Sequence, residues 1–174
     1  MPNIDSTTIE AMLSACSVYK GYCFPMIGLH PTSVNANYEK ELEIVARELK
    51  FSKEYVAIGE IGMDLYWDKT YLKEQQIVLD KQVNWALEYD LPIVIHCRDA
   101  FDYIYKVLEP YKKTPLRGIF HSFTGTAEEA TRVLEFSDFF IGINGVVTFK
   151  KSHLPEILAG IPLEKIVLET DSPY

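Results

Sequence analysis

Positive charge is scarce in this sequence. It holds 17 lysines and arginines against 25 aspartates and glutamates, which gives a formal net charge of −8 at pH 7. Proteins that grip nucleic acid through bulk electrostatics need a basic face that releases counterions from the phosphates. The composition argues against that mode of binding, so any phosphate chemistry requires a metal ion or a few local cations.

Cysteine and long apolar runs are scarce too. The cysteines, Cys16, Cys23 and Cys97, are too few and too scattered for a disulfide framework or a thiolate zinc knuckle. We expect them to be small buried hydrophobic residues in a reducing compartment. No window approaches the roughly 18 apolar residues that span a bilayer, and residues 1–5 do not resemble a signal sequence. We therefore expect a cytoplasmic protein with no membrane partner and no obligate protein partner.

Short apolar runs alternate with helical patterns from end to end. No low-complexity tract, charge block or flexible linker interrupts them, so we expect residues 1–174 to form a single domain. Six runs are apolar on both faces, as strands of a parallel sheet buried on two sides must be. The expected strands are 23–30, 55–62, 91–97, 117–123, 138–145 and 165–171.

Helical spacing appears between these runs. The expected helices include one capped by Ser6 or Thr7, one with apolar positions from Leu42 to Leu49, one from Leu72 to Leu87, and one that opens on a capping box of Thr126 and Glu129. Strands that alternate with helices in this way indicate repeated βαβ units. A doubly wound sheet and a (β/α)₈ barrel both satisfy the pattern.

The polar residues at the strand ends separate these two folds. Five of the six expected strands end in a polar or ionisable residue: His30, Glu60, His96, His121 and Asp171. In a barrel every strand opens on one face, where the active site is assembled, whereas an open sheet needs functional groups only near its switch point. The pattern therefore favours a TIM (β/α)₈ barrel.

Three imidazoles and two carboxylates at one barrel mouth predict a metal site. Such ligands suit zinc, manganese or iron, while carboxylates alone lean toward magnesium. A metal held there lowers the pKa of water toward about 7, which favours hydrolysis. We expect Glu60, His96, His121 and Asp171 to be ligands, although Asp171 also fits a helix N-cap before Pro173.

Two further residues are candidates for substrate binding. His30, which precedes Pro31, either contacts a substrate phosphate or braces its loop. Arg98 either neutralises an anionic substrate or pairs with Asp99. His153, in a polar segment, is expected to be exposed.

At these residues the sequence resembles the TatD family of metal-dependent hydrolases, within the wider amidohydrolase-like group of barrels. The matching segments, in order along the chain, are "GLHP" (28–31), "GEIGMD" (59–64), "IHCRDA" (95–100), "GIFHSFTG" (118–125), "GINGVVTFK" (142–150) and "ETDSPY" (169–174). The resemblance implies one to two divalent metal ions (Mg, Mn or Zn), a DNA or other phosphodiester substrate, and exonuclease-type deoxyribonuclease activity.

The resemblance also implies roles for individual residues. Glu60 is similar to the family's bridging carboxylate, His96 and His121 to its strand-borne ligands, and Asp171 to its last-strand ligand, which also orients or deprotonates the attacking water. Glu60 and Asp171 are therefore the expected catalytic residues.

The sequence departs from the family at its ends. It has no His-x-His pair, which supplies two more ligands in the family, and it stops before the family's closing helices. We therefore expect an incomplete barrel that lacks its first strand, with low activity and a tendency to self-associate. The alternatives are a metal-dependent amidohydrolase, an esterase acting on aminoacyl-nucleic acid, and an inactive fragment.

Overall fold

The computed structural model describes residues 1–170, which form a sheet of six parallel strands with helices between them. The strands are β1 (Met26–Ile27), β2 (Ala57–Asp64), β3 (Ile93–Arg98), β4 (Gly118–Phe120), β5 (Phe139–Ile143) and β6 (Ile166–Leu168). The α-helices are α1 (Ile9–Val18), α2 (Tyr38–Phe51), α3 (Leu72–Glu88), α4 (Phe101–Leu108), α5 (Ala127–Val133) and α6 (Leu154–Leu158).

The strand order distinguishes a barrel from a doubly wound sheet. The strands pair in the sequence β1-β2-β3-β4-β5-β6, all parallel, so each neighbour in the chain is a neighbour in the sheet. A doubly wound sheet reverses its order at a switch point, and the described residues contain no such reversal. Within residues 1–170 the first and last strands do not pair with each other, so the molecule is a partial barrel.

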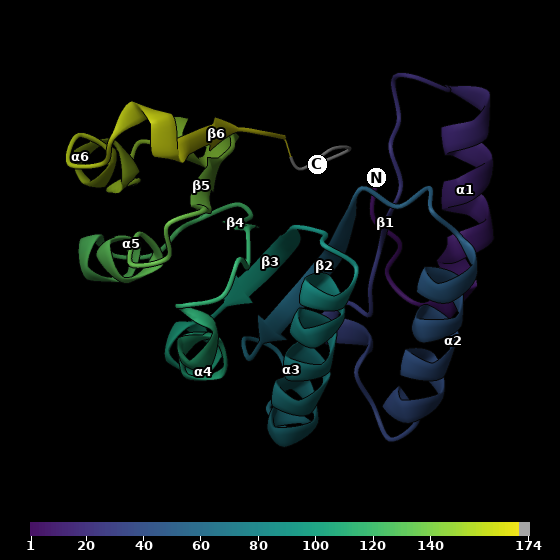
Figure 1. Ribbon diagram of the computed structural model, residues 1–174. Coiled ribbons are helices and arrows are strands. Elements are labelled where there is room, and N and C mark those ends of the chain that lie inside the picture. Colours follow the sequence, from purple (N-terminus) through teal and green to yellow (C-terminus); the bar gives the residue numbers. More distant parts are fainter. Residues whose placement is uncertain (171–174) are drawn as a thin grey trace.

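The helices cover the outer side of the curved sheet. Figure 1 shows the strands following an arc, with the helices along its convex side. The core between the two layers is apolar: Val45 of α2 and Leu79 of α3 are fully buried, as are Ile58 and Ile95 of the sheet. Burial of both faces explains why the central strands read as near-continuous apolar runs.

The helix starts agree with the sequence in part. Thr126 caps α5 and forms the expected capping box with Glu129. The expectation that Ser6 or Thr7 caps the first helix was wrong: a short 3-10 turn (Ser6–Thr8) precedes α1, and Asp5 is its N-cap. The Asp5 carboxylate accepts the Thr7 amide at 3.0 Å, because a carboxylate satisfies the free amides of a first turn well.

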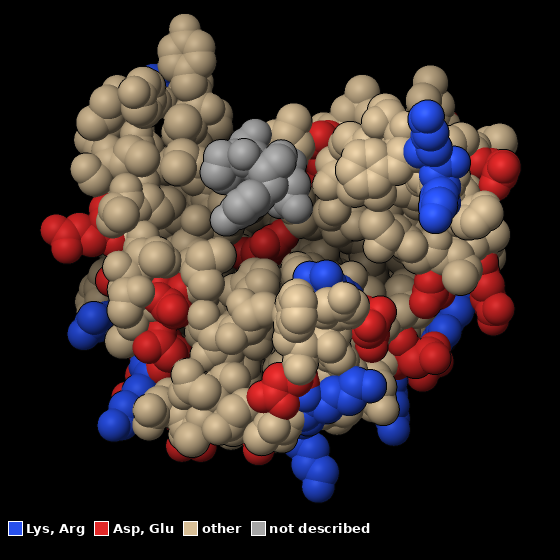
Figure 2. Space-filling view, turned by 180° about the vertical axis from the view of Figure 1, so that it is seen from behind, with Lys and Arg blue, Asp and Glu red and all other residues tan. Residues whose placement is uncertain are grey.

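The surface carries both signs of charge. Figure 2 shows lysine and arginine side chains interspersed with aspartate and glutamate on the face seen from behind, without a continuous basic area there. In residues 1–170, no helix is long and apolar enough to cross a bilayer.

Candidate metal centre

Glu60 lies at the centre of the candidate site, with imidazoles around it. Its Oε2 is 3.5 Å from Nε2 of His30, and its Oε1 is 3.1 Å from Nε2 of His121. His96 packs edge-on against His30 with ring centroids 4.7 Å apart, and one ligand atom each from His30, Glu60 and His96 lies within 4.8 Å of the others. The structure thus brings four of the sequence-predicted residues into one cluster, while Asp171 lies outside the described residues.

The sequence suggested that Glu60 stands at the end of its strand, but the structure places it within the strand. Strand β2 continues to Asp64, and its register with β3 shifts between Ile58 and Ile61. Such a bulge re-aims a side chain, and bulges are frequent beside active sites. Gly62 follows with φ +136°, and a Cβ there would overlap the carbonyl oxygen of His96, so only glycine permits this pairing.

His96 is held by a second carboxylate. Its Nε2 is 2.9 Å from Oδ2 of Asp64, a side chain that is only 5% exposed. The other oxygen of Asp64 accepts the amide of Tyr66 at 3.1 Å. Because the carboxylate accepts a hydrogen bond from the Nε2–H group, Nδ1 keeps its lone pair and is the nitrogen that can bind a metal.

His121 is held in the same way by Glu169. Its Nδ1 is 2.7 Å from Oε2 of Glu169, and Oε1 of Glu169 accepts the backbone amide of Ser122. Ser122 has φ 49°, a left-handed conformation that allows this contact directly after the strand. A Cβ at Gly142 would overlap the Glu169 carboxylate, so the absence of a side chain there makes room for it.

The surroundings of His121 fit a metal ion. Nδ1 faces Glu169 and Nε2 faces Glu60, so both ring nitrogens point at carboxylate oxygens. Such a ring carries either two protons or one proton and a metal cation in place of the other. Together with Glu60 and Nδ1 of His96, this arrangement offers the mixed imidazole and carboxylate donors that divalent transition metals prefer.

His30 differs from the other two imidazoles. Its Nδ1 accepts the backbone amide of Thr32 at 3.2 Å and lies 2.7 Å from the Thr32 hydroxyl. A neutral ring that accepts at Nδ1 carries its proton on Nε2. The Nε2–H group faces Glu60, so in this arrangement His30 is a hydrogen-bond donor rather than a metal ligand.

Buried amide side chains hold the loops that carry these residues. Asn3 exchanges two hydrogen bonds with the backbone of Gly28, at 2.8 and 2.9 Å. Gln82 exchanges two hydrogen bonds with the backbone of Leu29 in the same manner, and Gln75 does so with the backbone of Asp64. Each amide satisfies backbone groups that no neighbouring strand reaches, which fixes the strand ends on both sides of the site.

Burial and neighbouring charges set the ionisation of the cluster. Burial alone would raise the pKa of Glu60, but the hydrogen bond with His30 and the charges of His121, His30 and His96 outweigh it and lower that pKa. The pKa of His96 is also lowered, first by burial and then by His30, with Asp64 and Glu60 opposing. At neutral pH the site therefore holds an ionised carboxylate beside a neutral imidazole, which is the state a metal needs.

We expect the free energy of unfolding of the metal-free chain to fall as the pH drops below the ordinary histidine pKa of 6.5. Because the pKa of His96 is lowered by folding, the unfolded chain binds its proton first. The stabilisation is complete above the ordinary histidine value of 6.5 and is lost as the pH falls through the lower folded value. Urea unfolding in the presence of a chelator measures this loss of free energy. The expected loss is about 1.4 kcal/mol for each unit by which folding lowers the pKa of His96.

Two variants test whether His96 causes this pH dependence. His96→Asn removes this ring, which is 22% exposed, and flattens the dependence. His153→Asn removes a ring that is 87% exposed and contacts Glu156 at 3.4 Å, so it leaves the slope unchanged. An unaltered slope in His96→Asn contradicts the assignment.

Arg98 ends β3 and lies beside Asp64, its register partner on β2. Its guanidinium stacks over the ring of Tyr66 at 3.9 Å. In the part of the chain that the structure describes, no ion pair joins Arg98 to Asp99, so the structural alternative considered from the sequence is not formed there. His153, on the other hand, is exposed as expected.

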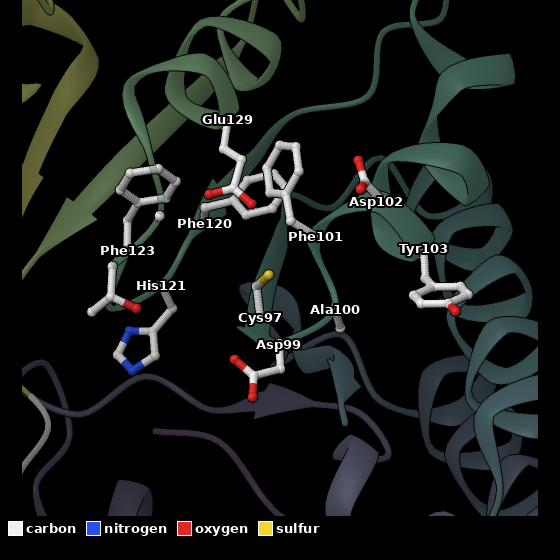
Figure 3. Close-up of a pocket in the computed structure, with 12 residues that line it drawn as sticks. Cys97, Asp99, Ala100, Phe101, Asp102, Tyr103, Phe120, His121, Phe123 and Glu129 are labelled. Carbon is white, nitrogen blue, oxygen red and sulfur yellow. The ribbon is translucent and has the colours of Figure 1, made fainter. Parts of the chain in front are cut away.

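His121 also lines a cavity of about 300 Å³. Figure 3 shows His121, Asp99, the thiol of Cys97 and the carboxylate of Glu129 among the residues that line it. Burial raises the pKa of Cys97 to about 12, so its thiol is neither a nucleophile nor a thiolate ligand at neutral pH. The carboxylates of this cavity disfavour an anion, in contrast to the side that carries His30 and Arg98.

Sequence reasoning missed Asp64 and Glu169. Both lie inside segments singled out for the resemblance, "GEIGMD" and "ETDSPY". Their partners lie 32 and 48 residues away, so no local spacing pairs them with His96 and His121. The available signal was a second carboxylate in each segment, because ligating histidines usually donate their other ring N–H to a carboxylate, backbone carbonyl or water.

Comparison with known proteins identifies a matching family. The profile described as TatD related DNase matches residues 1–174. The chain belongs to that family. It is 34% identical over 171 residues to the metal-dependent hydrolase YabD of Bacillus subtilis, covering 98% of this chain and 66% of YabD.

Other TatD-family proteins agree in sequence and in fold. The chain is 35% identical over 158 residues to the 3'-5' ssDNA/RNA exonuclease TatD of a Pantoea species, covering 90% of this chain and 60% of that protein. The crystal structure of YjjV from Escherichia coli matches with a TM-score of 0.89 at 29% identity, covering 98% of this chain and 66% of that one. The chain thus spans 60 to 66% of the length of these TatD-family relatives.

Proposed function

We propose that this protein is a metal-dependent hydrolase of phosphodiester bonds in nucleic acid, of the exonuclease type. The observation that carries the proposal is the position of His121 between Glu60 and Glu169, with Glu60 facing a second and a third imidazole. This pattern of ligand and outer carboxylate is typical of catalytic metal sites. The TatD name of the Pantoea relative supports the choice of substrate.

The proposed metal ligands are Glu60, His96, His121 and Asp171. The first three supply one carboxylate and two imidazole nitrogens, and Asp171 lies outside the described residues. The donor set fits one to two divalent ions such as Mg, Mn or Zn. A metal held there supplies hydroxide at neutral pH by lowering the pKa of water toward about 7. We propose that Asp171 orients or deprotonates the attacking water.

His30 and Arg98 are proposed to bind the scissile phosphate. The Nε2–H of His30 faces Glu60, because Thr32 occupies Nδ1, and we propose that it donates to a phosphate oxygen once Glu60 binds a metal. The guanidinium carbon of Arg98 lies 3.9 Å from the centre of the Tyr66 ring, and we propose that its N–H groups bind two phosphate oxygens. Neither residue lines the acidic cavity beside His121, whose carboxylates would repel a phosphate.

The proposal is tested by hydrolysis of a single-stranded oligonucleotide labelled at one end, with Mn²⁺ or Mg²⁺ added. The expected result is stepwise, metal-dependent shortening from one end. An aminoacyl ester and an amide of similar size are assayed in parallel, because the same nucleophile attacks a carbonyl. Cleavage of the carbonyl substrates with an intact oligonucleotide, or no cleavage with any metal, overturns the proposal.

A further inference from the structure

Two exposed aromatic rings stand beside the metal centre. Tyr66 and Trp67 follow the end of β2 and are 50% and 77% exposed, whereas the chain's other tryptophan, Trp85, is 8% exposed. The Tyr66 and Trp67 rings are perpendicular, with centroids 4.7 Å apart. A tryptophan usually buries 150–250 Å² and dominates core packing, so a ring left this open contributes little to this fold.

A cation accompanies the two rings. The guanidinium of Arg98 lies 3.9 Å from the centre of Tyr66 and 5.7 Å from that of Trp67. A cation–π contact of this kind restricts the guanidinium, and its N–H groups can still donate hydrogen bonds. Aromatic faces next to a phosphate-binding cation form the combination that recognises unpaired nucleotides.

Short contacts join these rings to the metal centre. The amide of Tyr66 donates to Asp64 at 3.1 Å, and the other oxygen of Asp64 is 2.9 Å from His96. Trp67 lines a cavity of about 140 Å³ together with Asp64 and with Thr32, the residue that fixes the His30 ring. A group bound on Trp67 is therefore close to a phosphate at His30 and Arg98.

We propose that Tyr66, Trp67 and Arg98 form a nucleobase-stacking site next to the metal centre. This inference rests on the proposed function and names the residues that would hold the base beside the scissile phosphate. Every base offers a flat face, so such a site tolerates any sequence. Bases in a duplex are already stacked on both faces, so a paired strand cannot use it.

Binding tests the site without requiring catalysis. Fluorescence anisotropy of an end-labelled oligothymidylate, with Ca²⁺ present as a divalent ion, gives the affinity of the chain and its variants. We expect Trp67→Ala to lower the affinity by about 5- to 150-fold and Trp67→Phe to retain most of it. Tyr22→Ala removes a ring that is 90% exposed elsewhere and leaves the affinity unchanged. An abasic oligomer of equal length and charge binds the wild type and Trp67→Ala equally.

Intrinsic fluorescence adds a direct readout. In a Trp85→Phe background Trp67 is the chain's one tryptophan, and we expect oligothymidylate to quench it while the abasic oligomer does not. Equal affinity of Trp67→Ala and the wild type for oligothymidylate overturns the stacking site, whether or not the strand is cleaved. A lowered affinity together with no cleavage by the wild type supports the stacking site and overturns the proposed function.

Discussion

Glu60→Gln is expected to abolish metal binding at the centre. Glu60 is the group that both His30 and His121 face, and its pKa is held below the usual value by those imidazoles. The amide keeps the size of the side chain but loses the negative charge. Because loss of an outer partner alone costs about 10- to 100-fold in metal affinity, loss of this central ligand costs more than about 100-fold.

Titration calorimetry with Mn²⁺ or Zn²⁺ measures the effect, and oligonucleotide hydrolysis is expected to fall to background in the same variant. Glu10→Gln makes the same change on the exposed face of α1 and serves as the control. Undiminished metal affinity in Glu60→Gln would show that the metal lies elsewhere.

Glu169→Gln is expected to weaken metal binding by about 10- to 100-fold, although Glu169 is not among the proposed ligands. One oxygen of Glu169 accepts the Ser122 amide, and the other faces Nδ1 of His121. In the glutamine variant the remaining oxygen stays with Ser122, so the new NH₂ group faces Nδ1. The ring must then carry its proton on Nε2, which faces Glu60 and is the nitrogen the metal needs.

Nitrogen NMR of the histidine rings distinguishes this tautomer change from a loss of structure, since the two ring nitrogens report their protonation separately. Asp64→Asn is expected to act in the same way on His96. Glu156→Gln alters the exposed partner of His153 and is the matched control. If Glu169→Gln binds metal as the wild type does, the outer carboxylate does not set the ring's protonation.

The parallel sheet could be predicted because its strands are buried on both faces and therefore form apolar runs. The predicted strand ends were less accurate, and β1 shows why. Residues 23–30 read as one strand, yet only Met26–Ile27 pair with β2. The backbone amides of Gly28 and Leu29 instead donate hydrogen bonds to the side chains of Asn3 and Gln82, which come from distant parts of the chain. A strand that ends on side-chain amides carries no local signal of where it ends.

The candidate site was predictable to a similar extent. His121, which directly follows β4, and His96, two residues before the end of β3, were found because approximate strand position and residue type are local features. Their outer carboxylates were not, since the contact of His96 with Asp64 and that of His121 with Glu169 exist only after the sheet forms. The tautomer of His30 was hidden for a different reason, because it depends on the backbone of Thr32 in the turn that follows.

The presence of a metal centre is tested most directly by elemental analysis of the purified chain after loading with Mn²⁺ or Zn²⁺ and removal of free metal. We predict at least one bound divalent ion per chain in the wild type, and none in a chain that carries Glu60→Gln. A wild-type chain without bound metal, or a variant that keeps the full amount, would contradict the centre built on Glu60, His96 and His121.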